Sequence, residues 1–283
     1  NINEDLAVYE CGINHNGTKV YLKTNTIISQ FGLNDTVYYF YELVNNNWQL
    51  NESIISLSAG SQGLLFSVIN DAWDTMVLYG DYNQTYIYKL SQEGVWNLNY
   101  TIPLGSQEID INYTGDVIVQ GNSGEGTNSQ GAVRVYKFEN NNWSQMGNTL
   151  VGPLPINYFG VDVRITNDGN RFAVASFNPT EESTNSVMKG RLIHIYDFNL
   201  DSNEWELYSN NPISYNMIEA TSYYPEIALS NDGSFVSFSS LDGNIIASNG
   251  YGHSEYNSKI ITIGLSNGGY NLISNSDINR RVY

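Results

Sequence analysis

Three carboxylates recur near the start of a similar predicted strand in consecutive parts of the chain: Asp110, Asp162 and Glu226. Such a recurrence would bring them to a common rim. Most glycosidases use two carboxyl groups, held roughly 5–9.5 Å apart, on either side of the bond that they cleave. A glycoside-processing enzyme is therefore one hypothesis for this chain. We favour the simpler interpretation, in which a solvated strand entry is repeated by ancestry.

Other catalytic groups are scarce. The chain has three histidines, of which His15 lies in a predicted turn and His194 lies within a predicted strand that we expect to face a blade surface; the third is His253. A Gly-x-Ser-x-Gly motif, which would mark a nucleophilic serine, is absent. The single cysteine, Cys11, is expected to be a partly buried and inert thiol, with an inter-chain disulfide as the alternative. We therefore predict no catalytic residue and no enzyme.

One segment resembles a cation-binding loop in its spacing. Asp197, Asn199, Asp201 and Asn203 place oxygen-bearing side chains at alternate positions, as calcium loops do. The segment lacks the glycine and the bidentate glutamate that complete such a loop, so we interpret it as an Asx-rich hairpin turn. We predict no metal site and no cofactor.

Acceptor motifs for N-linked glycans are frequent. Asn-x-Ser/Thr sequons occur at Asn16, Asn34, Asn51, Asn83, Asn99, Asn112 and Asn142, whereas Asn178 is disqualified by the proline that follows it. The number is what chance gives for a chain with 39 asparagines. Their places in predicted turns and loops are better evidence, and we predict glycans on most of the seven.

The candidate residues named above lie on or between β-strands that belong to an internal repeat of the sequence. An aromatic-rich strand runs into an aromatic anchor five times, in Thr36–Trp48, Gln84–Trp96, Gly131–Trp143, Gly190–Trp205 and Ser258–Tyr270. The anchors are 48, 47, 62 and 65 residues apart along the chain. Between them lies a strand, a tight polar turn of Asn, Asp, Gly or Thr, and a short apolar strand, best seen in Val161–Ser176 and Glu226–Ser240.

The aromatic strand and the segment between anchors together make one repeat. Five such repeats predict an all-β chain of five units with four antiparallel strands each, a β-propeller. We expect one domain over residues 1–283, with units at about 6–52, 53–100, 101–147, 148–210 and 211–283. A β-sandwich is the structural alternative. The first and last strands could complete one blade together, or the first could pair with a neighbouring subunit. The sequence leaves that choice open.

The stretch from Gly131 to Ser240 resembles the FG-GAP, or integrin-alpha-type, propeller repeat. It carries the aromatic strand, the Asn-Asn-Asn-Trp turn, the Phe159-Gly160 pair and the Asn-Asp-Gly turns at Asn167–Gly169 and Asn231–Gly233. The resemblance implies a propeller fold. It implies calcium-dependent adhesion only weakly, because no blade has the run of alternating carboxylates that the calcium loops of that family need.

The predicted connections suggest a binding face. Four long insertions, Asn25–Asn34, Asn122–Gln130, Phe177–Lys189 and Leu241–Asn257, occupy equivalent places in their units and should project from one face. The binding residues expected there are Tyr251, His253, Tyr256, Glu181 and Glu182. A lectin-like domain is a further hypothesis, with Trp73, which replaces the usual turn glycine, as the residue to inspect.

Composition points to the surface and its partners. With 29 acidic and 12 basic residues the net charge is −17, which repels nucleic acid, and no apolar run is long enough to span a membrane. Amides and hydroxyls dominate the surface, so we expect a secreted protein; the start at Asn1 suggests processing. Our main hypothesis is a non-enzymatic, N-glycosylated structural or adhesive module that self-associates in an extracellular filament, coat or appendage or binds other extracellular proteins.

Overall fold

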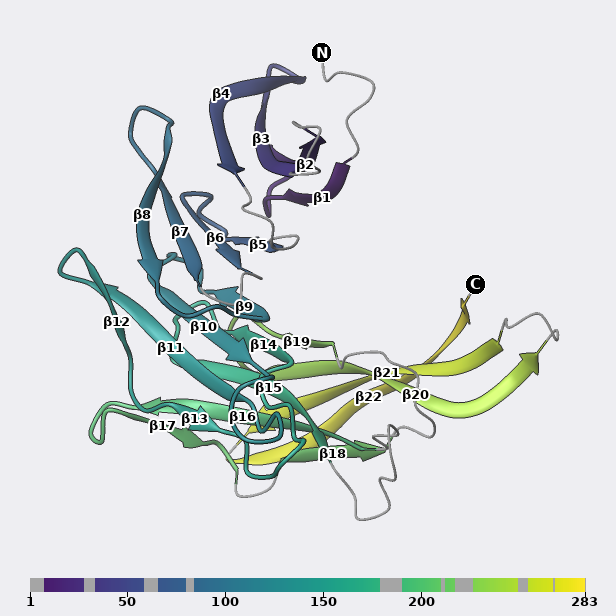
Figure 1. Cartoon of the computed structure of the whole chain (residues 1–283). Helices are drawn as coiled ribbons and strands as arrows, with labels where there is room; N and C mark the ends of the chain where they lie inside the picture. Colours follow the sequence, from purple (N-terminus) through teal and green to yellow (C-terminus); the bar gives the residue numbers. More distant parts are fainter. Residues whose placement is uncertain are drawn as a thin grey trace. The chain divides into compact units, whose positions relative to one another are not determined.

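The computed structural model consists of β-strands joined by turns and loops (Figure 1). It describes residues 8–27, 34–58, 66–79, 84–178, 190–209, 212–216, 226–248, 254–266 and 268–282. Within these ranges there is no helix, as the sequence predicts. The strands form five antiparallel sheets, each built on four strands that follow one another along the chain. The chain divides into two compact units, Asn1–Ser106 and Gln107–Tyr283.

Unit 1 contains two sheets. The first consists of β1 (Val8–Ile13), β2 (Lys19–Ile27), β3 (Asn34–Val44) and β4 (Asn47–Ser58), and the second of β5 (Phe66–Ile69), β6 (Thr75–Tyr79), β7 (Thr85–Leu90) and β8 (Trp96–Ile102). Aromatic side chains fill the core of this unit. Tyr38 and Met76 are fully buried, and the Phe40 and Trp96 rings stack with centroids 5.0 Å apart.

Unit 2 contains three sheets. Their strands are β9 (Glu108–Ile111), β10 (Val117–Asn122), β11 (Ala132–Glu139) and β12 (Asn142–Gln145); β14 (Asp162–Ile165), β15 (Arg171–Asn178), β16 (Gly190–Asn199) and β17 (Glu204–Leu207); and β19 (Ile227–Leu229), β20 (Phe235–Ser248), β21 (Ser254–Ser266) and β22 (Gly269–Val282). The short strands β13 (Leu150–Val151) and β18 (Ile213–Asn216) each add to the sheet that precedes them. Two apolar clusters fill the spaces between the three sheets.

The ends of the chain lie in different sheets. β1 pairs with β2 in the first sheet, whereas β22 pairs with β21 in the last. The possibility that the two termini complete one blade is therefore wrong. A second difference concerns the predicted insertion Leu241–Asn257, because β20 and β21 continue through most of it as a long hairpin (Figure 1).

The turn between the first two strands of each sheet reverses the chain through left-handed backbone. The residue in this conformation is Gly17, Trp73, Gly115, Gly169 or Gly233, with φ between 61° and 72°. Only glycine adopts this region without steric cost, and Trp73, whose side chain is buried in the core of unit 1, is the exception. The Asn-Asn corners Asn45-Asn46 and Asn140-Asn141 also have positive φ at both positions, as two-residue hairpins of type I′ require.

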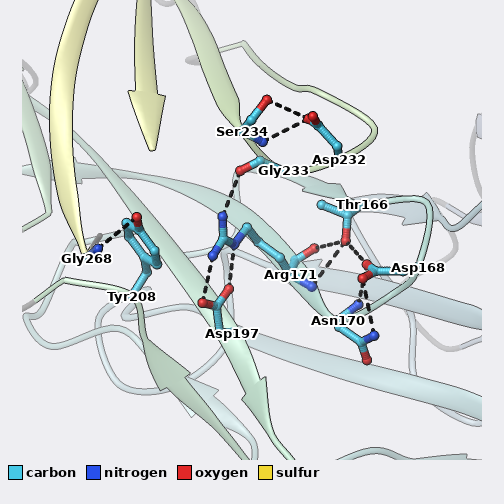
Figure 2. Close-up of polar contacts among 10 residues, drawn as sticks. All are labelled: Thr166, Asp168, Asn170, Arg171, Asp197, Tyr208, Asp232, Gly233, Ser234 and Gly268. Atoms are coloured by element: carbon cyan, nitrogen blue, oxygen red, sulfur yellow. Dashed lines mark hydrogen bonds and ion pairs between the residues drawn. The ribbon is translucent and has the colours of Figure 1, made fainter. Parts of the chain in front are cut away.

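Side chains hold these first turns in two ways. In the third sheet Asn112 Oδ1 accepts hydrogen bonds from the Asp116 and Val117 amides at 3.0 and 2.9 Å. In the fourth sheet Thr166 Oγ1 donates to Asp168 Oδ1 at 2.6 Å and accepts from the Arg171 amide at 3.2 Å (Figure 2). Either arrangement satisfies backbone donors that would otherwise lack a partner.

The aromatic anchors pack between neighbouring sheets. Trp205, on β17, donates its Nε1–H to Met146 O at 2.9 Å and meets the Phe172 ring edge-on at 4.8 Å. Tyr270, on β22, approaches Tyr208 at 6.1 Å. Trp48 differs, since 47 % of its surface stays exposed on the outer strand β4. The anchor of the first sheet is therefore not buried, in contrast to Trp96, Trp143 and Trp205.

Candidate functional site

Counting residues back from the turn between the first two strands of each sheet shows which carboxylates occupy equivalent positions in the sheets of unit 2. Asp162 and Glu226 each stand four residues before the turn residue, Thr166 or Ser230, and the residue four before Asn112 is Glu108, not Asp110. The strand pairings confirm this alignment. In all three sheets of unit 2, the paired residues that flank the first turn are seven positions apart in the sequence. Counting back from the turn, rather than from the apparent start of the strand, would have found Glu108.

Glu108 and Asp162 meet at one arginine. The first strands β9 and β14 lie side by side in unit 2, and Arg164 is two residues along β14 from Asp162, so both point to the same face of the strand. Arg164 Nη1 lies 2.5 Å from Asp162 Oδ1 and 3.4 Å from Glu108 Oε1. These two carboxylate oxygens can be no further apart than the sum of those distances.

Backbone amides of the neighbouring sheets fix the two aspartates. Asp110 Oδ2 accepts from the Ile165 amide at 2.8 Å, and Asp162 Oδ2 accepts from the Ile227 amide at 2.6 Å. Arg164 also donates to Val163 O at 2.6 Å. Asp110 therefore connects β9 to β14, and Asp162 connects β14 to β19. We call Glu108, Asp110, Asp162 and Arg164 the carboxylate–arginine cluster.

Burial gives the two carboxyl groups pKa values near neutrality. Desolvation, and after it the negative charge of Asp162, raises the pKa of Glu108 to about 7, although Arg164 opposes the shift. Desolvation also raises the pKa of Asp162 to about 6, against the attraction of Arg164 and the hydrogen bond from the Ile227 amide. The cluster therefore binds a proton near neutral pH, and the higher pKa of Glu108 favours that proton on Glu108 over Asp162.

The third predicted carboxylate has another environment. Glu226 directly precedes β19 and its side chain is exposed, while Ile227, the next residue, is buried and donates to Asp162. The structure thus brings Asp110 and Asp162 together on neighbouring strands, adds Glu108 and Arg164, and leaves Glu226 at the surface.

The sequons have different surroundings. Asn16, Asn99 and Asn142 are exposed, and Asn51 is half-buried on β4. Asn112 is 3 % exposed and its amide nitrogen donates to Asp116 Oδ1 at 2.8 Å, so the folded structure offers no room for a glycan there. Asn34 begins β3, where its side chain lies outside the described part, and Asn83 lies outside the described residues altogether.

The expected binding face falls largely outside the described residues. Glu181, Glu182, Tyr251 and His253 all lie there. Tyr256 is on β21, opposite Arg280 of β22, and its side chain is likewise not described. The structure therefore leaves this predicted face untested.

Two other candidates have surroundings that differ from those expected. Trp73 is 5 % exposed and packs 6.0 Å from the Tyr21 ring in the core of unit 1, so it cannot stack on a sugar at the surface. Cys11 is exposed on β1 rather than partly buried. Trp73, the residue singled out for the lectin hypothesis, therefore belongs to the core of unit 1.

The segment with calcium-loop spacing is a hairpin turn. Asp197 binds Arg171 through both carboxylate oxygens, at 2.5 and 2.8 Å (Figure 2), and Asn199 Oδ1 accepts from the Asp201 amide at 2.8 Å. This is the Asx turn that the sequence favours. Among the residues that the structure describes, no group of three or more His, Cys, Asp or Glu side chains has the arrangement of a metal site.

His194 is buried within β16, where its ring meets the edge of Phe159 at 5.5 Å and its Nδ1 has no hydrogen-bond partner. Desolvation lowers the pKa of His194 to about 4. A histidine in the unfolded chain binds a proton below about pH 6.5, so folding stability is lost as the pH falls from there to about 4.

We expect His194→Phe to remove this loss. Between pH 7 and pH 4 the wild type should lose roughly 3 kcal/mol more unfolding free energy than the variant. Urea denaturation at each pH measures the difference, with His15→Phe in the exposed first turn as the control. Parallel pH dependence of wild type and His194→Phe would show that His194 is not buried in its neutral form.

Comparisons with known proteins establish the fold. No family model matches the chain, and no curated protein matches it. A protein assigned as a 6-phosphogluconolactonase from Bacteroides fragilis superposes with a TM-score of 0.55 at 9 % identity, over 96 % of this chain and 84 % of its own. The tricorn protease gives 0.56 at 12 % identity over 97 % of this chain, which spans only 27 % of that enzyme. Both are β-propellers, and this chain has the β-propeller fold with five four-stranded blades.

The same comparisons contradict our main hypothesis about function. Both similar structures carry the names of enzymes, which a non-enzymatic structural or adhesive module does not lead one to expect. The alternative of a glycoside-processing enzyme agrees better with them only in that it is an enzyme, since one of the two names is that of a protease. No helix among the described residues is long and apolar enough to cross a membrane.

Proposed function

We propose that this chain is a carbohydrate hydrolase that cleaves a glycosidic bond at the carboxylate–arginine cluster. The observation that carries the proposal is the pairing of Glu108 and Asp162 across one arginine nitrogen, with pKa values of about 7 and about 6. Two carboxyl groups whose environments separate their pKa values are how glycosidases obtain an acid and a carboxylate in one site.

The roles follow from protonation and access. Glu108 has about a quarter of its side chain exposed and is protonated up to about pH 7, so it donates its proton to the leaving glycosidic oxygen. Asp162 is nearly buried, fixed by Arg164 and the Ile227 amide, and ionised above about pH 6. We assign Asp162 as the carboxylate that stabilises or captures the positive charge that develops at the anomeric carbon.

The spacing favours retention of configuration. Inverting enzymes hold their two carboxyl groups about 6.5–9.5 Å apart and retaining enzymes about 5–5.5 Å, and the shared contact with Arg164 Nη1 keeps the nearest oxygens of Glu108 and Asp162 closer than the inverting range. In this scheme Asp162 bonds to the anomeric carbon as the glycosidic C–O bond breaks and the Glu108 proton passes to the leaving oxygen. Water then attacks the anomeric carbon, gives its proton to Glu108 and releases Asp162.

A sugar lactone is the second candidate substrate. It is favoured by the name of the Bacteroides fragilis propeller. Ester hydrolysis would need Glu108 ionised, as a base for water, so this activity would rise above pH 7 where glycoside cleavage falls.

The remaining expectations are proposals of smaller scope. We propose secretion with N-linked glycans on Asn16, Asn99 and Asn142, supported by the exposure of these three residues and by the amide-rich composition. Association with itself or with other extracellular proteins, and membership of the FG-GAP family, are further proposals that stand on the sequence patterns alone.

Turnover of 4-nitrophenyl glycosides tests the proposed function. The purified chain, assayed at pH 6.5 with a panel of α- and β-linked glucosides, galactosides, mannosides and N-acetylglucosaminides, should release nitrophenol from at least one of them. Gluconolactone in the same panel separates the two candidate reactions. No release from any substrate, with an intact β-sheet circular dichroism spectrum, would contradict the proposal.

A further inference from the structure

Two loops of unit 2 are held together by backbone hydrogen bonds. The first, residues 123–131, joins β10 to β11, and the second, residues 152–161, joins β13 to β14. Three amides of the second loop donate to three consecutive carbonyl oxygens of the first, at 2.8, 3.0 and 3.1 Å: Ile156 to Asn128, Tyr158 to Ser129 and Phe159 to Gln130. We call them the paired loops, and each loop fixes the course of the other.

Both loops contain left-handed backbone at residues other than glycine. The φ angle is 57° at Asn128, 53° at Ser129, 58° at Ile156 and 48° at Tyr158. Asparagine tolerates this region, but for the β-branched Ile156 it is a true outlier. Such strain persists only where the surrounding structure enforces it, and it concentrates at functional sites and at the clamps that hold ligands. The strained conformation of Ile156 therefore points to a binding role for the loop that carries it.

The second loop presents apolar side chains to the solvent. Leu154 and Ile156 have 43 % and 44 % of their surface exposed, and Val151, at the end of β13, has 55 %. Pro153 and Pro155 flank Leu154 and fix their own φ angles, which restricts the backbone around it. We call Val151, Leu154 and Ile156 the apolar ridge. Its side chains are held in place before a ligand arrives, which reduces the entropy lost on binding.

The paired loops adjoin the carboxylate–arginine cluster. Glu108 and Asp162 are the first residues of β9 and β14, and Glu108 pairs with Gly121 near the end of β10. Gly121 packs directly on Gly160 of the second loop, where a Cβ atom added to Gly121 would lie 2.3 Å from Gly160 O. Loops at the strand ends that carry a site commonly supply the residues that bind its ligand.

We infer that the apolar ridge binds an apolar aglycone, the aryl or alkyl group joined to the sugar that the cluster cleaves, an inference that rests on the function proposed above. The leaving group lies on the side of the acid, Glu108, whose paired residue Gly121 contacts the second loop. Sugar hydroxyl groups need polar partners, which the three ridge side chains do not offer. Burying about half of a phenyl group on this surface strengthens binding by about tenfold.

Binding of thioglycosides, which resist hydrolysis, tests the inference separately from turnover. The probes are the phenyl and the methyl thioglycosides of glucose, galactose, mannose and N-acetylglucosamine. In ¹H–¹⁵N NMR spectra, at least one phenyl thioglycoside should shift the amide signals of Ile156 and Tyr158, which report on the paired loops. The methyl thioglycoside of the same sugar should need about tenfold higher concentration for an equal shift.

Glycine variants separate the strain from the apolar contact. Ile156→Gly and Leu154→Gly remove side chains of nearly equal exposure, but only Ile156 has left-handed backbone, which glycine adopts without cost. Both variants should reduce the preference for the phenyl probe, whereas the urea midpoint of Ile156→Gly should lie above that of Leu154→Gly. Leu200→Gly removes an exposed apolar side chain from the β16–β17 hairpin and should leave the preference unchanged.

The outcomes separate the inference from the proposed function. Equal binding of the phenyl and methyl probes overturns the inference, and so do unmoved Ile156 and Tyr158 signals with every probe or an equal loss of preference in Leu200→Gly. A urea midpoint of Ile156→Gly at or below that of Leu154→Gly removes the strain from which the inference starts. Preference for a phenyl probe without hydrolysis of any glycoside supports the inference and contradicts the proposed function, and hydrolysis without that preference does the reverse.

Discussion

We expect Glu108→Gln to lower kcat/KM on the glycoside that is cleaved best by a factor of about 10²–10⁴. Glutamine keeps the size and the hydrogen-bonding capacity of the side chain but has no proton to donate to the leaving oxygen. A leaving group that needs no protonation should lose less. Comparing a 2,4-dinitrophenyl glycoside with an alkyl glycoside in steady-state assays therefore distinguishes loss of the acid from a general loss of structure.

Glu226→Gln is the matched control for this experiment. Glu108, Asp162 and Glu226 each stand four residues before the turn residue of their own sheet, but the side chain of Glu226 is exposed. We expect the control to keep kcat/KM within about twofold of the wild-type value, because surface substitutions of this kind leave the site unchanged. Equal losses in the two variants would remove Glu108 from the catalytic role.

The second large effect concerns stability. Trp205→Ala should lower the unfolding free energy of unit 2 by about 3–5 kcal/mol, since it leaves a cavity between the third and fourth sheets. The indole is 3 % exposed, donates to Met146 O and meets the Phe172 ring edge-on. Urea denaturation followed by circular dichroism measures the change.

The first sheet provides the control for this variant. Trp48 has the same hairpin position, opposite Leu43 as Trp205 is opposite Phe198, but it is 47 % exposed. Trp48→Ala should therefore cost less than about 1 kcal/mol. Losses of similar size in the two variants would show that the aromatic anchors do not owe their contribution to packing between sheets.

Local patterns in the sequence predicted the fold because each blade repeats the same local chemistry. Alternating strands, Asn-Asn corners and turns with Asn, Asp or Gly specify hairpins whatever lies beside them, and the five sheets confirm those predictions. The exposure of Trp48 was not predictable in this way, because burial of an anchor depends on which neighbour covers its sheet. Similar hairpins, such as those of Trp48 and Trp205, thus differ in exposure.

The site was predicted only in part, for a related reason. Asp162 was among the residues chosen from the sequence, but Glu108 was missed because strands were aligned by their apparent starts and not by the turns. Arg164 carried no signal of its own, since its role depends on β9 and β14 lying side by side. Asp110 appeared equivalent to Asp162, but it stands two residues before its turn residue, Asn112, whereas Asp162 stands four residues before Thr166.

The pH dependence of glycoside cleavage tests the central claim most directly. The acid form of Glu108 is lost above about pH 7, and the carboxylate form of Asp162 is lost below about pH 6. The account therefore predicts a bell-shaped profile of kcat/KM with its maximum between pH 6 and 7, and Glu108→Gln should abolish the alkaline limb. A profile that rises steadily above pH 7, or one that is flat from pH 5 to 8, would contradict the assignment of these two carboxyl groups.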